Sequence, residues 1–425
     1  MLDINLIRTN PALVKKDLEK RYQKEKKELV DHVVNLDKKY REILQELEKL
    51  RYERNIISEN INRLRKENKS FVKELERARS LPKEISKLGN EVNLIKEKIN
   101  DYLLEIPNIL EKDVPRGKTA KDNVVIKKFG KPKKFKFELK NHAELIEHFG
   151  YADFDQGISN AGKGFNYLIG KVAILDLALQ RYGVDFLIKE GFTAVIPPIM
   201  LNYKTLLGVV NGLKDFEDVV YKIENENLYL IGTAEHSLAS LYKNKILKKD
   251  DLPQKFFAVT PCFRKEVGGH GIDTKWLFRM HQFNKVEQVI YTTPENSIKH
   301  LNYMQNLTEK FFRSLKIPFR VIEICSGDLG NKFAKQYDIE AWFPRQKEYA
   351  EVTSAGSCTD YQARALNIKY VDKNNEKKFV HILNNTMVAT SRAMVAILEN
   401  YQQKNGSVKI PKVLQKYTGF KEIKS

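Results

Sequence analysis

The sequence predicts an α+β fold, in which an antiparallel sheet with inserted helices follows an N-terminal antiparallel pair of long helices. Two apolar seams with heptad spacing occur before residue 105. From Asn141 onward, short strand-like segments alternate with helix-like segments. At 263–287, two stretches with period-2 patterning flank a cluster of glycines, which is a hairpin signal.

Composition narrows the functional class. A chain of 425 residues can form more than one domain, and a charged content of 30% suits long exposed helices. The net charge of +19 attracts polyanions, so nucleic acid is the first partner to consider. A lysine-rich amino-acid usage, with many lysines among glutamates on helices, explains the charge equally well, and both readings stay open.

Cysteine usage and hydropathy predict a cytoplasmic protein. Cys262, Cys325 and Cys358 are far apart and odd in number, which argues against disulfides and against closely spaced zinc ligands. No apolar run approaches the roughly 18 residues of a membrane span. The first residues carry an early acid and no cationic stretch, so we expect no signal peptide.

The N-terminal part reads as a helical hairpin. Asn10 followed by Pro11 predicts the start of a short helix that ends near Arg21. Two heptad seams then follow, separated by the polar residues 67–70, and they predict two long helices that fold back on each other. The seams are Leu36, Tyr40, Ile43, Leu47, Leu50, Arg54, Ile57, Ile61 and Leu64, then Leu81, Ile85, Leu88, Val92, Ile95, Ile99 and Tyr102.

This hairpin is expected to protrude, because ~35 residues at 1.5 Å per residue span about 50 Å. Pro82 predicts a kink or a restart of the second helix. Residues 1–105 hold 25 Lys and Arg against 20 Asp and Glu. By itself such a coiled coil fits a dimerisation device, a spacer or an RNA-binding arm.

Turn residues divide the chain into two domains. Pro107 and Pro115 lie in stretches that end the second long helix and predict a boundary, giving domains 1–113 and 114–425. Residues 116–140 hold ten Lys or Arg against two acids and read as a basic linker. That linker either contacts a phosphate backbone or is simply solvated.

The second domain is predicted from alternating patterns. We expect helices at 168–190 and 391–401, and a helix after 233–235. The expected strands lie at 192–200, 228–231, 256–259, 319–325, 338–342, 348–352 and 379–383.

Charged residues on these elements are the candidate site. Common nucleotide and metalloprotease fingerprints are missing from the sequence. Glu235, Glu287 and Glu351 lie on otherwise apolar elements, where an unpaired charge is expensive, and Arg392 begins the last helix. Structural ion pairs are the alternative reading of each residue alone. In the hairpin, alternation groups Arg264 with Glu266, groups Arg279, His281, Phe283 and Glu287 on one face, and groups Phe278, Met280 and Val286 on the other.

Several stretches together resemble the seryl-tRNA synthetase family of class II aminoacyl-tRNA synthetases. The resemblance covers nearly the whole chain and includes the hairpin arm. The stretches are LEIPN at 104–108, GFTAVIPP at 191–198, TAE at 233–235, FRKE at 263–266 with RMHQF at 279–283 and Glu287, EVTS at 351–354 with TDYQAR at 359–364, and NNT at 384–386 with Arg392. The resemblance implies a class II catalytic domain that activates L-serine with ATP to seryl-adenylate. It also implies that the seryl group is then transferred to the 3′ end of tRNA(Ser).

The resemblance also implies individual roles. Arg264 would bind the α-phosphate, Glu266 the adenine amino group, and Phe283 with Arg392 would sandwich the adenine ring. Arg264, Glu266 and Arg392 are the expected catalytic residues. The implied ATP-binding residues are Arg264, Lys265, Glu266, Phe283, Glu351, Val352, Thr353, Ser354 and Arg392. Serine is assigned to Thr233, Ala234, Glu235, Glu287 and Thr386. Mg²⁺ would reach Glu351 and Ser354 through ATP.

The family further implies a homodimer, with Pro198 at the interface, whose arm reaches the tRNA of the other subunit. It implies no membrane partner. Charging of selenocysteine tRNA is left open. The chain departs from the usual pattern at 208–216, at 355–357, and in the hairpin loop at His270 and Trp276.

Two other functions remain to be weighed. A related ligase that charges a protein carrier would lack the long arm. A non-catalytic RNA-binding adaptor would be expected to lose the nucleotide arginines Arg264 and Arg392, and this chain has both.

Overall fold

The computed structural model describes residues 1–210, 212, 219–266 and 277–424. The chain forms two compact units. One unit comprises Met1–Glu19 and Gln23–Ile106, and the other comprises Lys20–Tyr22 and Pro107–Ser425. The division into functional domains 1–113 and 114–425 stays a prediction.

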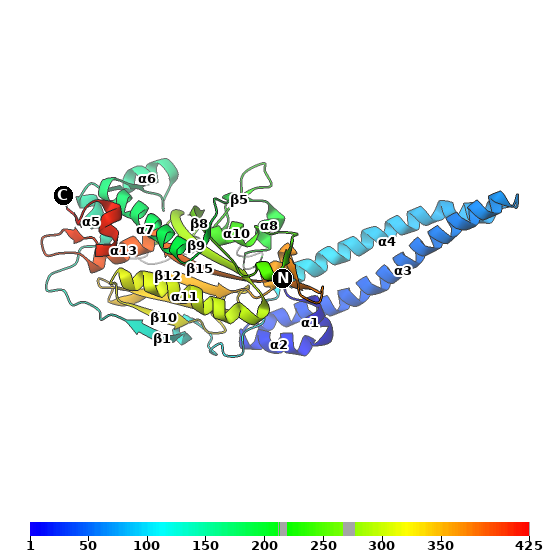
Figure 1. The fold of residues 1–425 in the computed structure, drawn as a ribbon, viewed down its shortest axis with the longest axis horizontal. Helices are drawn as coiled ribbons and strands as arrows, with labels where there is room; N and C mark the ends of the chain where they lie inside the picture. Colours follow the sequence, from blue (N-terminus) through cyan, green and yellow to red (C-terminus); the bar gives the residue numbers. More distant parts are fainter. Residues whose placement is uncertain (211, 213–218, 267–276, 425) are drawn as a thin grey trace. The chain divides into compact units, whose positions relative to one another are not determined.

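The first unit is a helical hairpin with two short helices at its base. It contains α1 (Ile4–Thr9), α2 (Pro11–Lys20), a 3₁₀ turn η1 (Lys24–Lys26), α3 (Lys27–Lys66) and α4 (Val72–Glu105). The long helices lie side by side and run in opposite directions, as the two seams predict (Figure 1). Asp3 begins α1 by accepting a hydrogen bond from the backbone N–H of Asn5.

The seams face each other along α3 and α4. Leu47 on α3 and Leu81 on α4 are 2% and 0% exposed, whereas Arg54, the polar break in the first seam, is exposed. Across the pair, Arg77 donates to both carboxylate oxygens of Glu53 at 2.7 and 2.9 Å. The helix α4 runs unbroken through Pro82, so the restart expected there does not occur.

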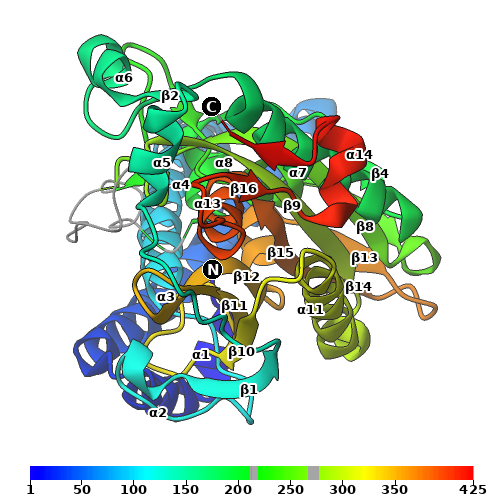
Figure 2. The ribbon, with the colours of Figure 1, turned by 90° about the vertical axis from the view of Figure 1, so that its left-hand side faces the viewer.

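The second unit is built on an eight-stranded sheet in the order β1-β10-β11-β12-β15-β9-β8-β4. Neighbouring strands are antiparallel except for the parallel pair β4 and β8. Figure 2 shows β9, β15, β12, β11 and β10 following one another across this sheet. The strands are β1 (Val124–Phe129), β4 (Thr193–Ala194), β8 (Gln254–Phe263), β9 (Gln282–Thr292), β10 (Phe319–Glu323), β11 (Lys335–Phe343), β12 (Glu348–Ser357) and β15 (His381–Ala389).

Short sheets and helices surround this sheet. The small sheets pair β2 (Ala152–Asp153) with β3 (Tyr167–Leu168), β5 (Met200–Leu201) with β6 (Tyr229–Leu230), β16 (Val408–Lys409) with β17 (Glu422–Ile423), and β13 (Lys369–Val371) with β7 (Ile246–Lys248) and β14 (Lys377–Phe379). The helices are α5 (His142–His148), α6 (Phe154–Ala161), α7 (Gly170–Lys189), α8 (Tyr203–Leu207), α10 (Ala234–Ala239), α11 (Ser297–Ser314), α12 (Tyr361–Leu366), α13 (Thr390–Asn400) and α14 (Gln415–Thr418). Four 3₁₀ turns are η2 (Ala120–Asp122), η3 (Lys249–Asp251), η4 (Pro294–Asn296) and η5 (Lys412–Leu414).

The helices α7 and α11 pack on one face of the large sheet, and the cavity lies on the other face, where α10 also packs. A Cβ at Gly183 of α7 would meet Val286 and Val388 at 3.2 and 3.4 Å, so this helix packs directly on β9 and β15. The α11 hydroxyl of Thr308 accepts from Gln288 at 3.1 Å on the same face. Because side chains alternate along β9, Lys285 and Glu287 point to the opposite face.

Several expected elements differ from the structure. The strand expected at 192–200 is two short strands, β4 and β5, because Pro197 and Pro198 between them have no N–H to donate to a ladder. The strand expected at 379–383 is the end of β14 and the beginning of β15. Residues 116–140 are not a linker throughout, since β1 pairs with β10 at the sheet edge.

The core of the second unit is a continuous apolar cluster beneath the helix-covered face. Cys262, Cys325 and Cys358 are buried and unpaired, as the sequence predicts. In the parts of the chain that the structure describes, no helix is both long and apolar enough to cross a membrane.

Candidate active site

A cavity of about 320 Å³ opens on the face of the sheet opposite α7 and α11. It brings together most residues that the sequence assigned to a site, from five separate stretches of the chain. Twelve of the predicted residues line it: Thr233, Glu235, Arg264, Glu266, Phe283, Glu287, Glu351, Val352, Thr353, Ser354, Thr386 and Arg392. Ala234 and Lys265 do not line it.

The hairpin of β8 and β9 supplies a cation above an aromatic ring. Cys262 pairs with Phe283 near the end of the ladder, so Arg264 follows immediately after the strand. The Arg264 Nε donates to the carbonyl of Gly232 at 3.1 Å, and the guanidinium carbon lies 5.3 Å from the centroid of the Phe283 ring. This contact fixes one edge of the guanidinium by a backbone carbonyl and one face by an aromatic ring.

Glu266 lies just beyond Arg264 in a left-handed backbone conformation, with φ of 50°. Its carboxylate Oε2 forms an ion pair with Arg279, at 2.9 Å from the guanidinium Nε. The strand β8 has ended at Phe263, and the left-handed conformation of Glu266 is not that of a strand. Arg264 and Glu266 both line the cavity, as predicted, but strand alternation is not the reason.

A buried carboxylate lies deeper in the cavity on β9. Glu287 is 1% exposed, lies 2.8 Å from the Lys285 ammonium and accepts from the Thr386 hydroxyl at 3.0 Å. Burial raises the pKa of Glu287, and the Lys285 charge only partly opposes this effect. The register pairs Glu287 with Thr386 across β9 and β15, which explains why they meet.

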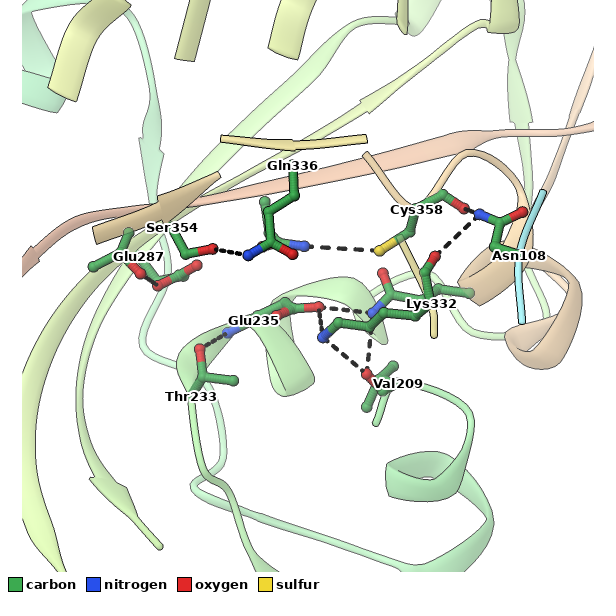
Figure 3. A network of polar contacts seen from close by, with 12 residues as sticks. Asn108, Val209, Thr233, Glu235, Glu287, Lys332, Gln336, Ser354 and Cys358 are labelled. Carbon is green, nitrogen blue, oxygen red and sulfur yellow. Dashed lines mark hydrogen bonds and ion pairs between the residues drawn. The ribbon is translucent and has the colours of Figure 1, made fainter. Parts of the chain in front are cut away.

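A second buried carboxylate comes from the first turn of α10. Thr233 caps this helix by accepting from the backbone N–H of Glu235 at 3.1 Å. Glu235 is 5% exposed, and its Oε1 is 2.6 Å from the Lys332 ammonium and 2.8 Å from the Gln362 amide (Figure 3). The cap places this carboxylate at the cavity wall.

A β-bulge aims the β12 side chains. Glu340 of β11 pairs with Glu351, but Ile339 pairs with Thr353, so Val352 is an extra residue in β12. Without the bulge Glu351 and Ser354 would project to opposite faces of the sheet, because they are three residues apart. The extra residue brings both to one face, and both line the cavity.

Opposite charges meet at this bulge. Arg392 lies 3.2 Å from the Glu351 carboxylate and also donates to the Glu351 carbonyl at 3.1 Å. Desolvation raises the pKa of Glu351, but the Arg392 guanidinium, together with Arg264 and Lys285, outweighs it and the net pKa is lowered. Burial, and next the nearby Glu351 charge, raise the pKa of Asp338 on β11 well above its usual value. The Gln336 amide bridges Asp338 and Ser354 at 3.1 and 3.0 Å.

The two predicted aromatic-stacking partners do not face each other directly. Arg392 lies over the ring of Phe278, with its guanidinium carbon 5.1 Å from the centroid, whereas Phe283 is covered by Arg264. A sandwich of adenine between Phe283 and Arg392 therefore stays a prediction. Phe278 and Met280 line the cavity, so their assignment to the opposite face is wrong. The strand begins only at Gln282, and alternation does not extend before it.

His281 also departs from the expected face. Its ring stacks on Phe165 with centroids 5.3 Å apart, and it does not line the cavity. His236, next to Glu235, does line it. Burial, followed by three neighbouring cations, lowers the pKa of His236 well below its usual value, so this imidazole is neutral.

Sequence reasoning missed several residues of the cavity wall. Lys285 could have been found, because it lies on β9 between Phe283 and Glu287 and shares their face. Asn384 lies two residues before Thr386 on β15 and also lines the cavity. No sequence pattern pointed to Lys332, because it lies in an irregular segment between β10 and β11, where periodicity does not assign a face. The atypical loop residues His270 and Trp276, and the glycines of that loop, lie outside the described residues.

The arrangement divides the cavity by chemistry. Buried carboxylates at Glu235 and Glu287, each beside a lysine, form a deep end that suits an ammonium group with a nearby polar substituent. The guanidinium groups of Arg264 and Arg392, each on an aromatic ring, form an end that suits a phosphate attached to a planar base.

Comparisons with known proteins identify the family of the chain. Residues 219–401 match the family model of the tRNA synthetase class II core domain (G, H, P, S and T), and residues 1–110 match the seryl-tRNA synthetase N-terminal domain. The chain is 48% identical to the serine–tRNA ligase of Pyrococcus horikoshii, over 100% of this chain and 97% of the relative. It is 46% identical to that of Methanospirillum hungatei, over 100% of both.

Solved structures show the same similarity. The crystal structure of seryl-tRNA synthetase from Pyrococcus horikoshii complexed with ATP matches with a TM-score of 0.91 and 48% identity, over 100% of this chain and 99% of that one. The cytoplasmic serine–tRNA ligase from Naegleria fowleri in complex with AMP matches with a TM-score of 0.85 and 34% identity, with the same coverage. The α+β class II fold predicted from the sequence is thus confirmed. The chain belongs to the seryl-tRNA synthetase family of class II serine–tRNA ligases.

Proposed function

We propose that this chain activates L-serine with ATP and then transfers the seryl group to tRNA(Ser). The observation that carries the proposal is the set of groups that line one cavity. The buried carboxylates Glu235 and Glu287 line it together with two guanidinium groups that lie over aromatic rings, Arg264 over Phe283 and Arg392 over Phe278. One cavity therefore offers acceptors for a serine ammonium, aromatic rings for an adenine and cations for the phosphate that joins them.

In the first step, a serine carboxylate oxygen attacks the α-phosphorus of ATP. The new P–O bond forms seryl-adenylate as the bond to pyrophosphate breaks. Both reactants are anionic, so a guanidinium fixed in advance at the reacting phosphate lowers the barrier. Gly232 and Phe283 hold the Arg264 guanidinium in place in the absence of a ligand. We assign Arg264 to this role, with Glu266 and Arg392, which also line the cavity, as further nucleotide contacts.

Selection of serine is assigned to the deep end. Thr233, Glu235 and Glu287 supply acceptors for the ammonium and the hydroxyl, and Thr386 holds the Glu287 carboxylate by its own hydroxyl. A site built from buried polar groups rejects alanine, because the missing hydroxyl leaves those groups unpaired. Glu287 is the group most sensitive to this loss, since it is 1% exposed.

Mg²⁺ fits the donor set of β12. Glu351 and Ser354 share one face because of the bulge, and both offer hard oxygen ligands. No group of three or more His, Cys, Asp or Glu side chains among the described residues could hold a metal ion alone. This suits an ion that takes one or two protein ligands and completes its shell with ATP phosphates, where it neutralises phosphate charge. We propose that Glu351 and Ser354 hold Mg²⁺ with ATP.

In the second step, a terminal ribose hydroxyl of tRNA attacks the seryl carbonyl, and AMP leaves with its phosphate. We propose that the α3–α4 hairpin binds tRNA(Ser) through shape and phosphate charge rather than a base code. Its surface is mostly charged, and the whole chain carries +19.

We further propose a homodimer. Three apolar side chains of α7, Ile174, Leu177 and Ile188, are 40, 57 and 54% exposed. Ile196, between β4 and β5, is 101% exposed, and Pro198 is exposed beside it. Large apolar side chains left exposed on an isolated chain are characteristic of a subunit interface. A second copy of this chain would cover them.

A cytoplasmic location is proposed from the three free, buried cysteines, which persist as thiols in a reducing compartment. Cell fractionation with an antibody against the chain tests this location directly. A predominantly membrane or secreted fraction would contradict it.

The enzyme is tested by serine-dependent exchange between ATP and pyrophosphate. We expect exchange with serine and little with alanine, threonine or glycine. Charging is then measured with tRNA(Ser) and, as a second acceptor, selenocysteine tRNA. Absence of exchange with every amino acid would refute the enzyme, and exchange without charging of tRNA(Ser) would refute the second step.

A further inference from the structure

Lys332 lines the cavity and is not needed to bind any part of the proposed reactants. It lies between β10 and β11, is 4% exposed, and extends across the ring of Phe333, with Nζ 5.0 Å from the centroid. Although burial by itself lowers the pKa of the Lys332 ammonium, its acidic neighbours, Glu235 foremost, outweigh this and the net pKa is raised. The cavity wall therefore contains a permanent cation beside the carboxylate assigned to the serine amino group.

The backbone on both sides of Lys332 is fixed. The Asn108 amide donates to the Lys332 carbonyl at 3.0 Å and to the Cys358 carbonyl at 2.9 Å (Figure 3). The Asn108 backbone N–H donates to the Asn331 carbonyl at 2.8 Å, and Arg21 donates to the Phe333 carbonyl at 2.6 Å. With its backbone held at three successive carbonyls, the lysine presents its ammonium at a defined point.

That point is one oxygen of the Glu235 carboxylate. Lys332 Nζ is 2.6 Å from Oε1 and donates to the Val209 carbonyl at 3.3 Å. The Gln362 amide donates to the same two acceptors at 2.8 and 3.2 Å. Among the described residues, the side-chain hydrogen bonds to this carboxylate all end on Oε1. The second oxygen, Oε2, is left for an incoming donor.

The charges around Glu235 show what Lys332 does. The other nearby charges are the cations Lys285 and Arg264 and the carboxylate of Glu287, and Glu235 in turn contributes to the raised pKa of Glu287. Two further titratable groups are neutral, since burial lowers the pKa of His236 and raises the pKa of Cys358. Lys285 is already paired with Glu287. Removing Lys332 would therefore leave two buried carboxylates with one lysine beside them, a situation that favours protonation of one of them.

We propose that Lys332 is a positioning residue, which supplies the second cation beside the two buried carboxylates and holds Oε1 of Glu235 so that Oε2 accepts the amino group of serine. This inference rests on the proposed function, because it assumes that an ammonium substrate enters the deep end. Lys332 acts through Glu235 and touches no reacting atom. Its effect falls on binding of the amino acid, with nucleotide binding left as it is.

The test compares three variants with the wild type by serine-dependent ATP–pyrophosphate exchange between pH 5.5 and 9. Lys332→Met removes charge and hydrogen bonds, Lys332→Gln keeps a donor without charge, and Lys332→Arg keeps the charge. The matched control is Lys335→Met, which removes another buried lysine, paired with Asp113 and Glu323 and absent from the cavity wall. Thermal unfolding identifies variants that do not fold.

We expect KM for serine to rise about tenfold or more in Lys332→Met, with KM for ATP unchanged. The acid limb of kcat/KM for serine should move up by about one pH unit or more in both uncharged variants. Lys332→Arg should restore the limb, and Lys335→Met should lose stability without moving it. If Lys332→Met does not fold, the acid limb of kcat/KM for serine in Lys332→Gln is the deciding measurement.

Two results are informative in different ways. An unmoved acid limb and an unchanged serine KM in an active, folded Lys332→Gln would overturn the inference and leave the proposed function standing. A wild type without serine-dependent exchange would overturn the proposed function and this inference together.

Discussion

Replacing Arg264 by alanine tests the chemistry of the cavity most directly. The side chain makes one described hydrogen bond, from Nε to the Gly232 carbonyl at 3.1 Å, and covers Phe283 at 5.3 Å. The terminal Nη groups are thus available to a phosphate. Loss of one such preorganised donor costs about 2.7–4 kcal/mol of transition-state stabilisation, a fall in kcat of roughly 10²–10³.

The assay is pyrophosphate exchange at saturating serine and ATP. Arg264→Lys should recover only part of the rate, because an ammonium cannot reproduce the planar fork of a guanidinium. Arg313→Ala is the matched control, since Arg313 also lies over an aromatic ring, Phe129 at 5.5 Å, but outside the cavity. Exchange by Arg264→Ala within a few fold of wild type, with native-like unfolding, would refute the assignment of Arg264 to the reacting phosphate.

Three further predictions concern other parts of the chain. Deleting residues 30–100 and closing the hairpin with a short turn should leave serine-dependent exchange intact, because exchange needs no tRNA. The same deletion should reduce tRNA(Ser) charging at least tenfold. Equal loss of exchange and charging would contradict the role of the arm. Ile196→Glu should shift the chain toward monomer in sedimentation velocity, whereas Leu94→Glu, an exposed arm residue, should not; an unshifted Ile196→Glu would contradict the proposed interface. Relative to the wild type, Asp338→Asn should increase the free energy of unfolding more at pH 8 than at pH 5. The raised pKa of Asp338 means that the folded state binds the extra proton above the unfolded pKa, so wild-type stability from this group falls as pH rises through that window. Urea unfolding at both pH values measures this difference, and an equal effect at both would contradict the shift.

The helical hairpin shows how far local patterning reaches. Seam residues such as Leu47 and Leu81 are buried where the heptads place them, and the turn falls between α3 and α4 as expected. A heptad is a short-range code, because each helix needs only its own periodicity and one partner to bury the seam. Of the two outcomes expected at Pro82, a kink or a restart, the restart is wrong, because α4 is continuous through this residue; the kink stays a prediction.

The strand predictions failed where tertiary pairing decides the element. The alternation around Phe278 stops because the strand begins at Gln282, and β1 forms from a basic stretch because β10 offers it an edge. The bulge at Val352 is likewise set by the register of β11 against β12. None of these features is encoded within a few residues of sequence.

The sequence alone determined the fold class, the helical arm and the family, and it named twelve residues that share one cavity. Those features follow from periodicity and from motifs whose residues are close in the chain. Only the tertiary structure decided that Lys332 meets Glu235, that Arg264 covers Phe283, and that Glu351 and Ser354 share a face. These contacts join segments up to a hundred residues apart, and the register and packing that bring them together are properties of the folded sheet.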